Sequence, residues 1–335
     1  MKTLNIGVIG LGSIAQIIHL QNLKKMMNVE VVGICDIDDV KAMKISKKFK
    51  IPNFFSDPEE MINALDLDGL MVLTSTNLHY PILSFAAKKG IPTFIERPPF
   101  LNIDEYYKAK KLMENADTFI QIGTNQRFDQ DFILLKSILE KEELGEIVYA
   151  NLGWLQALKS KLMAPWQFSK NIAGGGVIYD LGFVLIDLLL WFLPNAKVKC
   201  VKANLSNKKL RKSVEDFGSI YLTFDNGTTA VIEVSWDNVH PEDKFFMKFY
   251  GTKGYASYPH LKFYQELHGR IVNLTPEKSS SKHSFKSSYY NEINYFLNAI
   301  RGKVQPAATI EEYEAVYKVL DAIDKSSRSG KEIHL

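Results

Sequence analysis

The segment GGGVIYDLGFVLID, residues 174–187, sets two carboxylates in an otherwise apolar stretch. On an α-helix, Asp180, Val184 and Asp187 stand at positions i, i+4 and i+7, so all three are predicted to project from one stripe. A catalytic set would need a titratable group in the middle, and valine can neither accept nor donate a proton. Asp187 is expected to bind a substrate hydroxyl, because a carboxylate in so apolar a helix needs a partner.

A glycine-rich turn near the N-terminus has the spacing of a dinucleotide-binding loop. A predicted strand, LNIGVI, runs into GLGSIA at residues 10–15, and helical periodicity follows. In this G-x-G-x-x-A pattern, Gly10 permits the tight turn, Gly12 lets the backbone approach a pyrophosphate, and Ala15 lets the helix pack close to the strand. The predicted cofactor-binding residues of the loop are Gly10, Gly12, Ser13, Ile14 and Ala15.

The next predicted strand, VEVVGICD, ends at Asp36, about 20 residues beyond the glycine loop. A carboxylate at this place hydrogen-bonds the ribose 2′-hydroxyl and would repel a 2′-phosphate. Ile37, Asp38 and Asp39 follow, with no arginine beside them. The sequence therefore predicts NAD as the cofactor in preference to NADP. A glycine turn in an unrelated α/β fold is disfavoured by the order strand, turn, helix, strand and acid.

Further apolar strand candidates follow helical stretches at residues 69–75, 91–96 and 118–124. Strands that alternate with helices predict an α/β Rossmann domain with a doubly wound parallel sheet, over residues 1–123. Ligands on such sheets bind beyond the carboxyl ends of the strands. His79 opens a helix after a strand, which favours a capping or cofactor-packing role over acid–base chemistry. The cofactor-binding candidates at these strand ends are Ser75, Thr76, Asn77, His79, Glu96 and Arg97.

The regular alternation of strand and helix ends near residue 125. Segments such as EIVYANLGWLQ, KVKCVKANLS and GSIYLTFDNGTTAVIEVSW favour strands, and the DNG in the last of them is a hairpin signal. Residues 124–335 are therefore predicted to form an α+β domain with a large, open, mainly antiparallel sheet. An open sheet would leave one face exposed, which favours oligomerisation of this domain.

Composition disfavours several classes of function. A chain of 335 residues exceeds the size at which one hydrophobic core keeps growing, so two domains are expected. Lys plus Arg exceed Asp plus Glu by only 41 − 38 = 3, and the sequence has no dense basic block, so nucleic acid is not an expected partner. The longest apolar run, LGFVLIDLLLWFLP, is shorter than the about 20 residues that span a bilayer, so no membrane association is expected. With Cys35 and Cys200 as the only cysteines, we expect no disulfide framework, no bound metal and a cytoplasmic location.

Motifs along the whole chain resemble those of the Gfo/Idh/MocA family of NAD(P)-dependent oxidoreductases. The resemblance lies in the glycine loop, TSTNLHYPI, the Glu-Arg-Pro after AAKKGIPTFI, GTNQRFD, GGGVIYDLG and the C-terminal stretch from SSYYNEINYF onward. It implies hydride transfer between a nicotinamide and a sugar, a sugar derivative or a cyclitol. It also implies that the second domain covers the nicotinamide with one sheet face and forms a homodimer or homotetramer with the other.

The sequence departs from the family pattern at two positions that handle protons. The family has lysine in a Glu-Lys-Pro motif and histidine in an Asp-x-Gly-x-His motif, where this chain has Arg97 and Val184. Arginine can hold a substrate oxygen through its planar fork, but it stays protonated. We therefore expect Arg97 to orient the substrate and stabilise alkoxide charge, and Asp180 to be the remaining proton-handling group. The substrate-side candidates are Asn125, Arg127, Trp166 and Asp187.

Three functions stay open at this point. The first is an NAD-dependent dehydrogenase or reductase with this atypical site. The second is a sensor or scaffold that keeps the cofactor cleft and has lost the chemistry, and the third is redox-neutral, NAD-assisted chemistry on a glycoside. Tyr179 is disfavoured as the replacement base, because on an α-helix it points about 100° away from Asp180. The enzyme is favoured over the sensor, because a site that had lost its catalytic function would not need to retain polar groups such as Arg97 and Asp180.

Overall fold

The computed structural model describes residues 2–157, 163–276 and 284–335. The chain divides into two compact units, each assembled from two segments. Unit 1 comprises Met1–Phe128 and Phe285–Tyr313, and unit 2 comprises Asp129–Ser284 and Glu314–Leu335. This division differs from the predicted boundary at 123/124, because helix α9 (Ser284–Ile300) packs with the first segment. Its residues Ile293, Phe296 and Leu297 are buried in the same core as Ile6 and Phe94.

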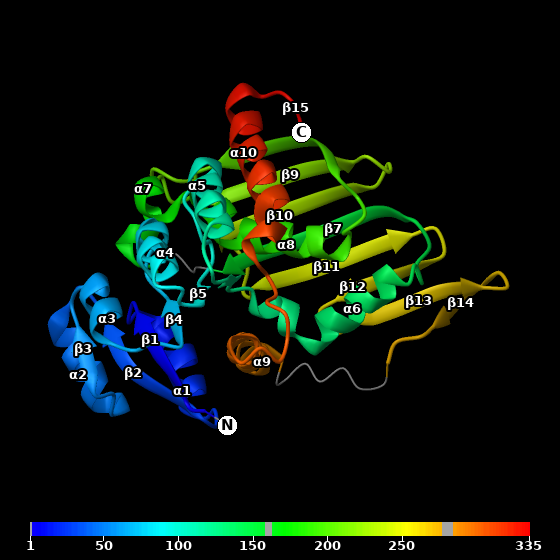
Figure 1. The fold of residues 1–335 in the computed structure, drawn as a ribbon. Helices are drawn as coiled ribbons and strands as arrows, with labels where there is room; N and C mark the ends of the chain where they lie inside the picture. The colour runs from blue at the N-terminus through cyan, green and yellow to red at the C-terminus, as the bar shows by residue number, and fades with distance from the viewer. Residues whose placement is uncertain (1, 158–162, 277–283) are drawn as a thin grey trace. The chain divides into compact units, whose positions relative to one another are not determined.

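Unit 1 confirms the predicted Rossmann fold. Among the described residues its sheet has six strands, all parallel, in the order β3-β2-β1-β4-β5-β6 (Figure 1). This is the doubly wound order, which reverses direction between β1 and β4 and places ligands at the carboxyl ends of the strands there. The strands are β1 (Leu4–Ile9), β2 (Val29–Cys35), β3 (Asn53–Phe55), β4 (Gly69–Val72), β5 (Thr93–Ile95) and β6 (Ile120–Ile122).

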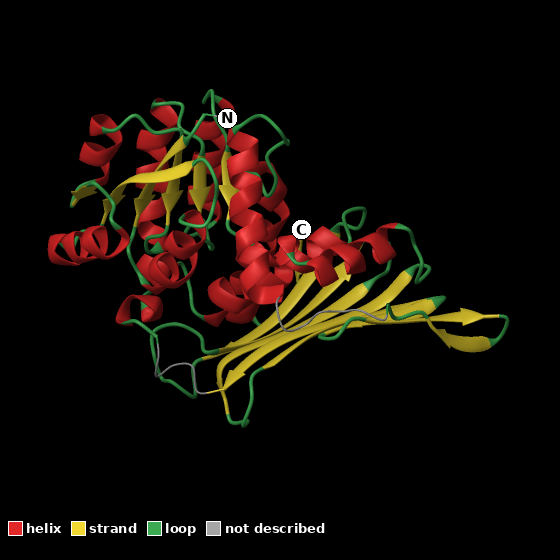
Figure 2. Ribbon diagram, turned by 90° about the horizontal axis from the view of Figure 1, so that it is seen from below, coloured by secondary structure: helices red, strands yellow, loops and turns green. Residues whose placement is uncertain are grey.

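Helices lie on both faces of this sheet, as Figure 2 shows. Three of these helices have a favourable N-cap residue, whose side chain accepts a hydrogen bond from the backbone N–H of the residue three positions later. These N-cap residues are Asp38, Asp57 and Asn102. The helices of the first segment are α1 (Leu20–Leu23), α2 (Asp39–Phe49), α3 (Pro58–Ala64), α4 (His79–Lys88) and α5 (Ile103–Glu114).

Unit 2 confirms the predicted open sheet. In the described part of the chain it has nine strands in the order β14-β13-β12-β11-β7-β10-β9-β8-β15, and all neighbours are antiparallel except β7 and β10. The strands are β7 (Ile147–Ala157), β8 (Val198–Ser206), β9 (Phe217–Phe224), β10 (Thr229–Asn238), β11 (Lys244–Gly251), β12 (Gly254–Tyr258), β13 (Lys262–Leu267), β14 (Arg270–Asn273) and β15 (Ile333–His334).

Helices cover one face of the unit 2 sheet. Helix α10 packs on β8 and against α8, and α8 also contacts β7. The side chains of β8 that point to this face include Val201 and Ala203, and the Ala203 N–H donates to Ser326 Oγ of α10 at 2.9 Å. The helices are α6 (Gln130–Glu140), α7 (Lys170–Ala173), α8 (Phe183–Phe192) and α10 (Glu314–Ser329).

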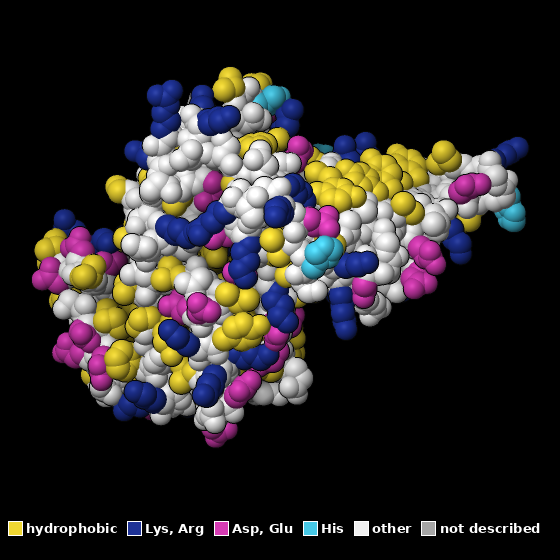
Figure 3. All heavy atoms as spheres, turned by 90° about the horizontal axis from the view of Figure 1, so that it is seen from above, with side chains coloured by type: hydrophobic (Ala, Val, Ile, Leu, Met, Phe, Trp, Pro, Cys, Tyr) yellow, Lys and Arg dark blue, Asp and Glu magenta, His cyan; other side chains and the backbone are white. Residues whose placement is uncertain are grey.

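The opposite face carries a row of side chains that follows the strand registers. Tyr264, Tyr255, Tyr250 and Tyr149 stand opposite one another on successive strands, with ring centroids 4.8–6.4 Å apart. Tyr250 is 40% exposed. Figure 3 shows hydrophobic side chains gathered along this part of the sheet.

The apolar run of the sequence lies in a longer helical segment than was predicted. Lys170–Phe192 includes α7, a π-helical turn and α8, and by length and composition alone it could cross a membrane. Within its apolar window, 78% of the residues are buried inside the protein. This is the position of a core helix.

Candidate functional site

The glycine loop after β1 has the geometry that a bound dinucleotide requires. Gly10 has φ +90°, and a Cβ there would lie 2.6 Å from the carbonyl carbon of Leu73, so no other residue fits. Among the described residues, a Cβ on Gly12 would meet no atom within 4 Å, so the backbone borders open space where a pyrophosphate can approach. Ser13 and Ile14 open the helix, and Ala15 is fully buried beneath them.

Asp36, at the end of β2, is tied to the glycine loop. Its Oδ2 accepts the N–H of Leu11 at 2.9 Å, and its Oδ1 accepts the N–H of Asp38 at 3.0 Å. The Nζ of Lys41 also lies 2.9 Å from Oδ1. Lys41 lies five residues after Asp36, in the first turn of α2, and the sequence analysis considered only the three residues that follow Asp36. The carboxylate is thus placed next to the loop with a cation already beside it.

The residues after β4 lie at the next strand end. Ser75 Oγ donates to Asn77 Oδ1 at 2.8 Å, and Thr76 is buried. The ring of His79 is buried between two backbone carbonyls, that of Thr74 at 3.1 Å from Nε2 and that of Pro99 at 3.2 Å from Nδ1. Burial lowers the pKa of His79 despite these carbonyls, so the imidazole is neutral. Its contacts are those of a packing residue between the two loops.

Glu96, at the end of β5, is paired with a histidine that the sequence analysis did not single out. Its Oε1 lies 2.7 Å from Nε2 of His19, which is fully buried at the end of a π-helical turn, Ala15–His19. Burial alone would raise the pKa of Glu96, but the hydrogen bond from His19 and the charges of His19 and Arg97 lower it overall. Glu96 is therefore an ionised carboxylate that joins the first helix to the end of β5.

Arg97 is half-buried and lies beside a second residue that sequence reasoning missed. Its guanidinium donates a hydrogen bond to the hydroxyl of Tyr289, a residue of α9 that is 6% exposed. Burial and the charge of Glu96 raise the pKa of Tyr289, and the effect of Arg97 is too small to reverse this. The phenol therefore carries its proton at neutral pH, next to a permanent cation.

Helix α9 also brings a second buried carboxyl to this edge of the sheet. Glu292 is fully buried, and its Oε1 accepts the N–H of Thr124 just after β6. Burial and the charge of Glu96 raise the pKa of Glu292 well above the ordinary value for a carboxyl, so the group is neutral. Unit 1 thus holds an ionised and a neutral carboxyl near Arg97.

Two of the predicted substrate-side residues have partners within unit 1. Asn125 is buried, and its Nδ2 donates to Ser288 Oγ at 2.9 Å. Arg127 Nη1 lies 2.5 Å from Glu312 Oε2, and the guanidinium stacks over the ring of Tyr313 at 5.2 Å. Both side chains therefore hold the loop after β6 against the 285–313 segment.

In unit 2, the helix with the two carboxylates is not a regular α-helix. Residues Ile178–Gly182 form a π-helical turn, and α8 begins at Phe183. A π-turn closes i→i+5 bonds, so the regular α-helix that the sequence analysis assumed for Tyr179, Asp180 and Val184 is absent from the first part of this segment. Asp180 is half-buried, whereas Val184 and Asp187 are each 1% exposed.

An aromatic side chain of unit 2 holds Asp180 in place. Its Oδ2 accepts a hydrogen bond from Nε1 of Trp236, a buried residue of β10, at 2.8 Å. Phe168 packs edge-on against Trp236, with ring centroids 6.0 Å apart and an interplanar angle of 87°. Trp166, two residues earlier, is 39% exposed. Asp180 is thus a carboxylate whose position is fixed by the indole N–H of Trp236.

Gly176, the last of the three glycines before this helix, is explained by Glu215, another residue that the sequence analysis missed. Glu215 Oε1 accepts the N–H of Gly176 at 2.8 Å and that of Ile178 at 3.2 Å. A Cβ on Gly176 would lie 2.0 Å from the carbonyl oxygen of Glu215. Burial raises the pKa of Glu215. The missing side chain of Gly176 thus lets the Glu215 segment approach closely enough to cap the helix that carries Asp180.

Two family models match the chain and together cover most of it. Residues 4–124 match the model described as oxidoreductase family, NAD-binding Rossmann fold. Residues 132–257 match the model described as GFO/IDH/MocA C-terminal domain.

Relatives match over nearly the whole length. The myo-inositol 2-dehydrogenase of Thermotoga maritima is 25% identical, with 99% of this chain and 98% of the relative covered. The D-glucoside 3-dehydrogenase of Escherichia coli is 22% identical, with 99% and 97% covered. A levoglucosan dehydrogenase solved with NADH and L-sorbose superposes with a TM-score of 0.90 at 19% identity, covering 100% of this chain and 99% of that one, which shows a shared fold.

Proposed function

The chain belongs to the Gfo/Idh/MocA family of oxidoreductases, and from this premise we propose that it transfers a hydride between NAD and a carbinol carbon of a sugar, a sugar derivative or a cyclitol. The observation that carries the proposal is the group of side chains at the end of β5. There Arg97 contacts the protonated Tyr289 next to the ionised Glu96. A permanent cation placed beyond a Rossmann strand can hold an oxygen on which negative charge develops.

The roles of the residues follow from their chemistry. Bound NAD supplies the hydride acceptor at the nicotinamide C4. Arg97 orients the substrate oxygen and stabilises its developing negative charge, because its planar fork remains charged at any relevant pH. Tyr289, through its contact with the guanidinium, fixes where that fork points. Asp180 takes the hydroxyl proton in the oxidation, with its carboxylate held in place by the indole N–H of Trp236.

The preference for NAD rests on Asp36. A carboxylate next to the glycine loop can accept hydrogen bonds from the ribose hydroxyls and repels a 2′-phosphate. Lys41 reduces this repulsion because its ammonium lies 2.9 Å from the same carboxylate. Both groups are in place before any cofactor binds, so we expect NAD to bind more tightly than NADP by a moderate factor.

The substrate class is inferred from the relatives and from unit 2. The curated relatives act, by their names, on myo-inositol and on a D-glucoside, and both are rings with many hydroxyls. Unit 2 carries groups that suit such a ring, because the carboxylate of Asp180 accepts hydrogen bonds from hydroxyls and the exposed Trp166 offers an apolar face.

A second function, cofactor sensing without turnover, is favoured by one observation. Val184, at the family's histidine position, is 1% exposed among apolar residues of α8. In that case the protein would bind NAD and signal its presence. The sequence reading of redox-neutral chemistry on a glycoside stays as a further alternative.

We also propose that the protein is a homo-oligomer. The tyrosine row on the open face of the unit 2 sheet is a large aromatic surface, of a kind that monomers rarely expose. A second copy would cover it. Sedimentation of the wild type and of Tyr250→Glu tests this, and we expect the variant to dissociate; a monomeric wild type would contradict it.

The test of the enzymatic function is nicotinamide absorbance with NAD and NADP against a panel of sugars, glycosides and cyclitols and their keto forms. We expect turnover of at least one polyhydroxylated ring, faster with NAD. If calorimetry shows NAD binding and the whole panel stays inert, the sensor is the better description. Product analysis of the glycosides separates the third alternative, because cleavage without net change in NAD would identify redox-neutral chemistry.

A further inference from the structure

Cys200 and His334 face each other across the last strand pair of the unit 2 sheet. Strand β15 pairs with β8 in antiparallel register, with His334 opposite Cys200, and the N–H of Leu335 donates to the carbonyl of Lys199 at 3.0 Å. Cys200 Sγ lies 3.0 Å from Nδ1 of His334. The pairing of β8 with β15 therefore places the thiol next to the imidazole, since both residues belong to regular strands.

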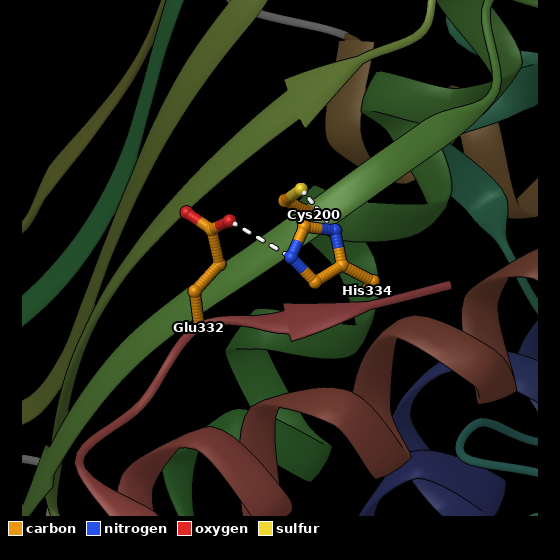
Figure 4. Close-up of side chains that lie close together, drawn as sticks. All are labelled: Cys200, Glu332 and His334. Carbon is orange, nitrogen blue, oxygen red and sulfur yellow. Dashed lines mark hydrogen bonds and ion pairs between the residues drawn. The ribbon is translucent and has the colours of Figure 1, made fainter.

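The second nitrogen of the same ring has a carboxylate partner. Nε2 of His334 lies 3.4 Å from Oε1 of Glu332. Figure 4 shows the sulfur, the imidazole and the carboxylate in series, with the ring between the other two. One donor atom from each residue lies within 4.8 Å of the others. A single metal ion would need one ring nitrogen to face both partners, whereas here each nitrogen faces a different one.

Of the three side chains, those of His334 and Glu332 are exposed to solvent, and Cys200 is buried behind the imidazole ring. The side chain of His334 is 70% exposed and that of Glu332 is 48% exposed, whereas Cys200 as a residue is 7% exposed. Along β8 the buried Val201 points toward α10, so Cys200 points to the opposite, open face of the sheet, as does the exposed Lys202. Cys200 lies on β8, beside the edge strand β15 and three strands away from β7, the nearest strand of the tyrosine row.

We propose that Cys200 is a reactive thiol, activated by His334 and Glu332, that is modified by soft electrophiles and hydroperoxides. The arrangement contains the parts that activate a cysteine: a base in hydrogen-bond reach of the thiol and a carboxylate that orients the base. His334 takes the thiol proton at Nδ1, and Glu332 stabilises the imidazolium through Nε2–H. This inference concerns unit 2 alone and does not rest on the proposed oxidoreductase activity.

The reaction with hydrogen peroxide balances within this set of groups. The thiolate sulfur forms a bond to one peroxide oxygen while the O–O bond breaks. Sulfur is oxidised to the sulfenic acid, and the peroxide is reduced. The departing hydroxide takes the proton from the His334 imidazolium and leaves as water, which returns the ring to its neutral form.

The other cysteine of the chain is a built-in control. Cys35, at the end of β2 in unit 1, is 1% exposed. Burial, with the charges of Asp57, Asp36 and Glu60, raises its pKa to about 12. A thiol of this kind is not a nucleophile at neutral pH. Any modification found on Cys200 and absent from Cys35 therefore reports the surroundings of Cys200.

The experiment is alkylation of the native, full-length protein by iodoacetamide at neutral pH, followed by peptide mass spectrometry. A free thiol is only a few per cent thiolate at this pH, so we expect Cys200 to react about tenfold faster than glutathione, with Cys35 unmodified. His334→Asn should bring Cys200 down to the rate of glutathione, and Glu332→Gln should give an intermediate rate. His268→Asn, an exposed histidine between β13 and β14, is the matched control and should change nothing.

Three results would overturn the proposal. Cys200 could react no faster than glutathione, as it would if a second copy of the chain covered it. Its rate could be the same in His334→Asn as in the wild type. Finally, Cys200 could be protected until a chelator is added, which would make the cluster a metal site. Labelling of sulfenic acid by dimedone after hydrogen peroxide gives a second readout and should follow the same order of variants.

Discussion

The two units hold their functional polar groups in different ways. In unit 1 the groups at the strand ends are joined to one another, Glu96 to His19 and Arg97 to Tyr289. In unit 2 Asp180 is held by the indole of Trp236 in an aromatic setting. In unit 1 the charged side chains are already paired with one another before a charged cofactor binds. In unit 2 a carboxylate is fixed beside an aromatic ring. Under the proposed function, unit 1 binds the cofactor and carries the cation that stabilises the reacting oxygen, and unit 2 carries the acid that takes the proton.

The largest effect is expected from removing the acid of unit 2. Asp180→Asn keeps the hydrogen bond from Trp236 but cannot take a proton, so we expect kcat to fall about 10³-fold, within the usual range for loss of a general base. NAD affinity, measured by calorimetry, should stay at the wild-type value. Asp225→Asn, in the turn between β9 and β10, is the control. Unchanged kcat in Asp180→Asn would remove unit 2 from the proton step.

The next effect is expected from the cation of unit 1. Arg97→Gln removes the charge beside Tyr289, and kcat/KM should fall about 10²-fold, as for the loss of one group that stabilises an oxyanion. Tyr289→Phe keeps the charge and loses the hydrogen bond, so a smaller loss is expected, with kcat affected more than KM. Steady-state kinetics of both variants against Arg270→Gln, on β14 of unit 2, measures this. Equal activity in wild type and Arg97→Gln would contradict a role for the cation.

A smaller effect is expected at the cofactor end of unit 1. Asp36→Asn loses a charged hydrogen-bond acceptor for the ribose, which corresponds to about 1.5 kcal/mol or a tenfold weaker binding of NAD. NADP binding should improve, because the repulsion of its 2′-phosphate disappears while Lys41 remains. Calorimetric titration with both cofactors is the measurement, and Asp39→Asn is the control. If the ratio of the two affinities does not move, another residue sets the cofactor preference.

The smallest effect concerns stability. The pKa of Glu292 is raised in the folded protein above the ordinary 4.5, so the proton stabilises the fold at low pH, and this contribution is lost as the pH rises through the folded pKa. Glu292→Gln cannot ionise. Relative to wild type, the variant should therefore gain stability with rising pH, by at most about 1.4 kcal/mol per pH unit.

Urea unfolding at several pH values measures the effect of Glu292→Gln. Glu266→Gln, exposed on β13, serves as the control and should show no such trend. A difference between the Glu292→Gln variant and the wild type that stays constant across pH would mean that Glu292 is already ionised in the fold.

The parts of the site that the sequence predicted are those made by neighbouring residues. The glycine loop and Asp36 belong to one continuous strand-turn-helix-strand segment, so their spacing in the sequence is enough to predict a dinucleotide-binding site. The partners of Glu96 and Arg97 come from elsewhere, with His19 separated from Glu96 by 77 positions. The π-helical turn at Ile178–Gly182 was also out of reach, because a period-3.6 pattern does not reveal i→i+5 bonding.

Two of the missed residues, Glu292 and His19, carry a signal of the same kind as Asp187. Asp187 was singled out because a carboxylate in an apolar helix needs a partner. Glu292 stands beside Ile293, Phe296 and Leu297 in α9, and the same argument applies to it. His19, four residues after Ala15, is another polar residue at a buried position. Buried polar residues on apolar helix faces are thus a usable signal.

The central claim is that this chain catalyses hydride transfer with Arg97 and Val184 in place of the family's lysine and histidine. The most direct test is nicotinamide absorbance on the best substrate of the panel, comparing the wild type with the double variant Arg97→Lys, Val184→His. We predict that the wild type turns over and that the double variant is slower, because the site is built around Arg97. A wild type that only binds NAD, together with a double variant that gains activity, would contradict the claim and identify the protein as a sensor.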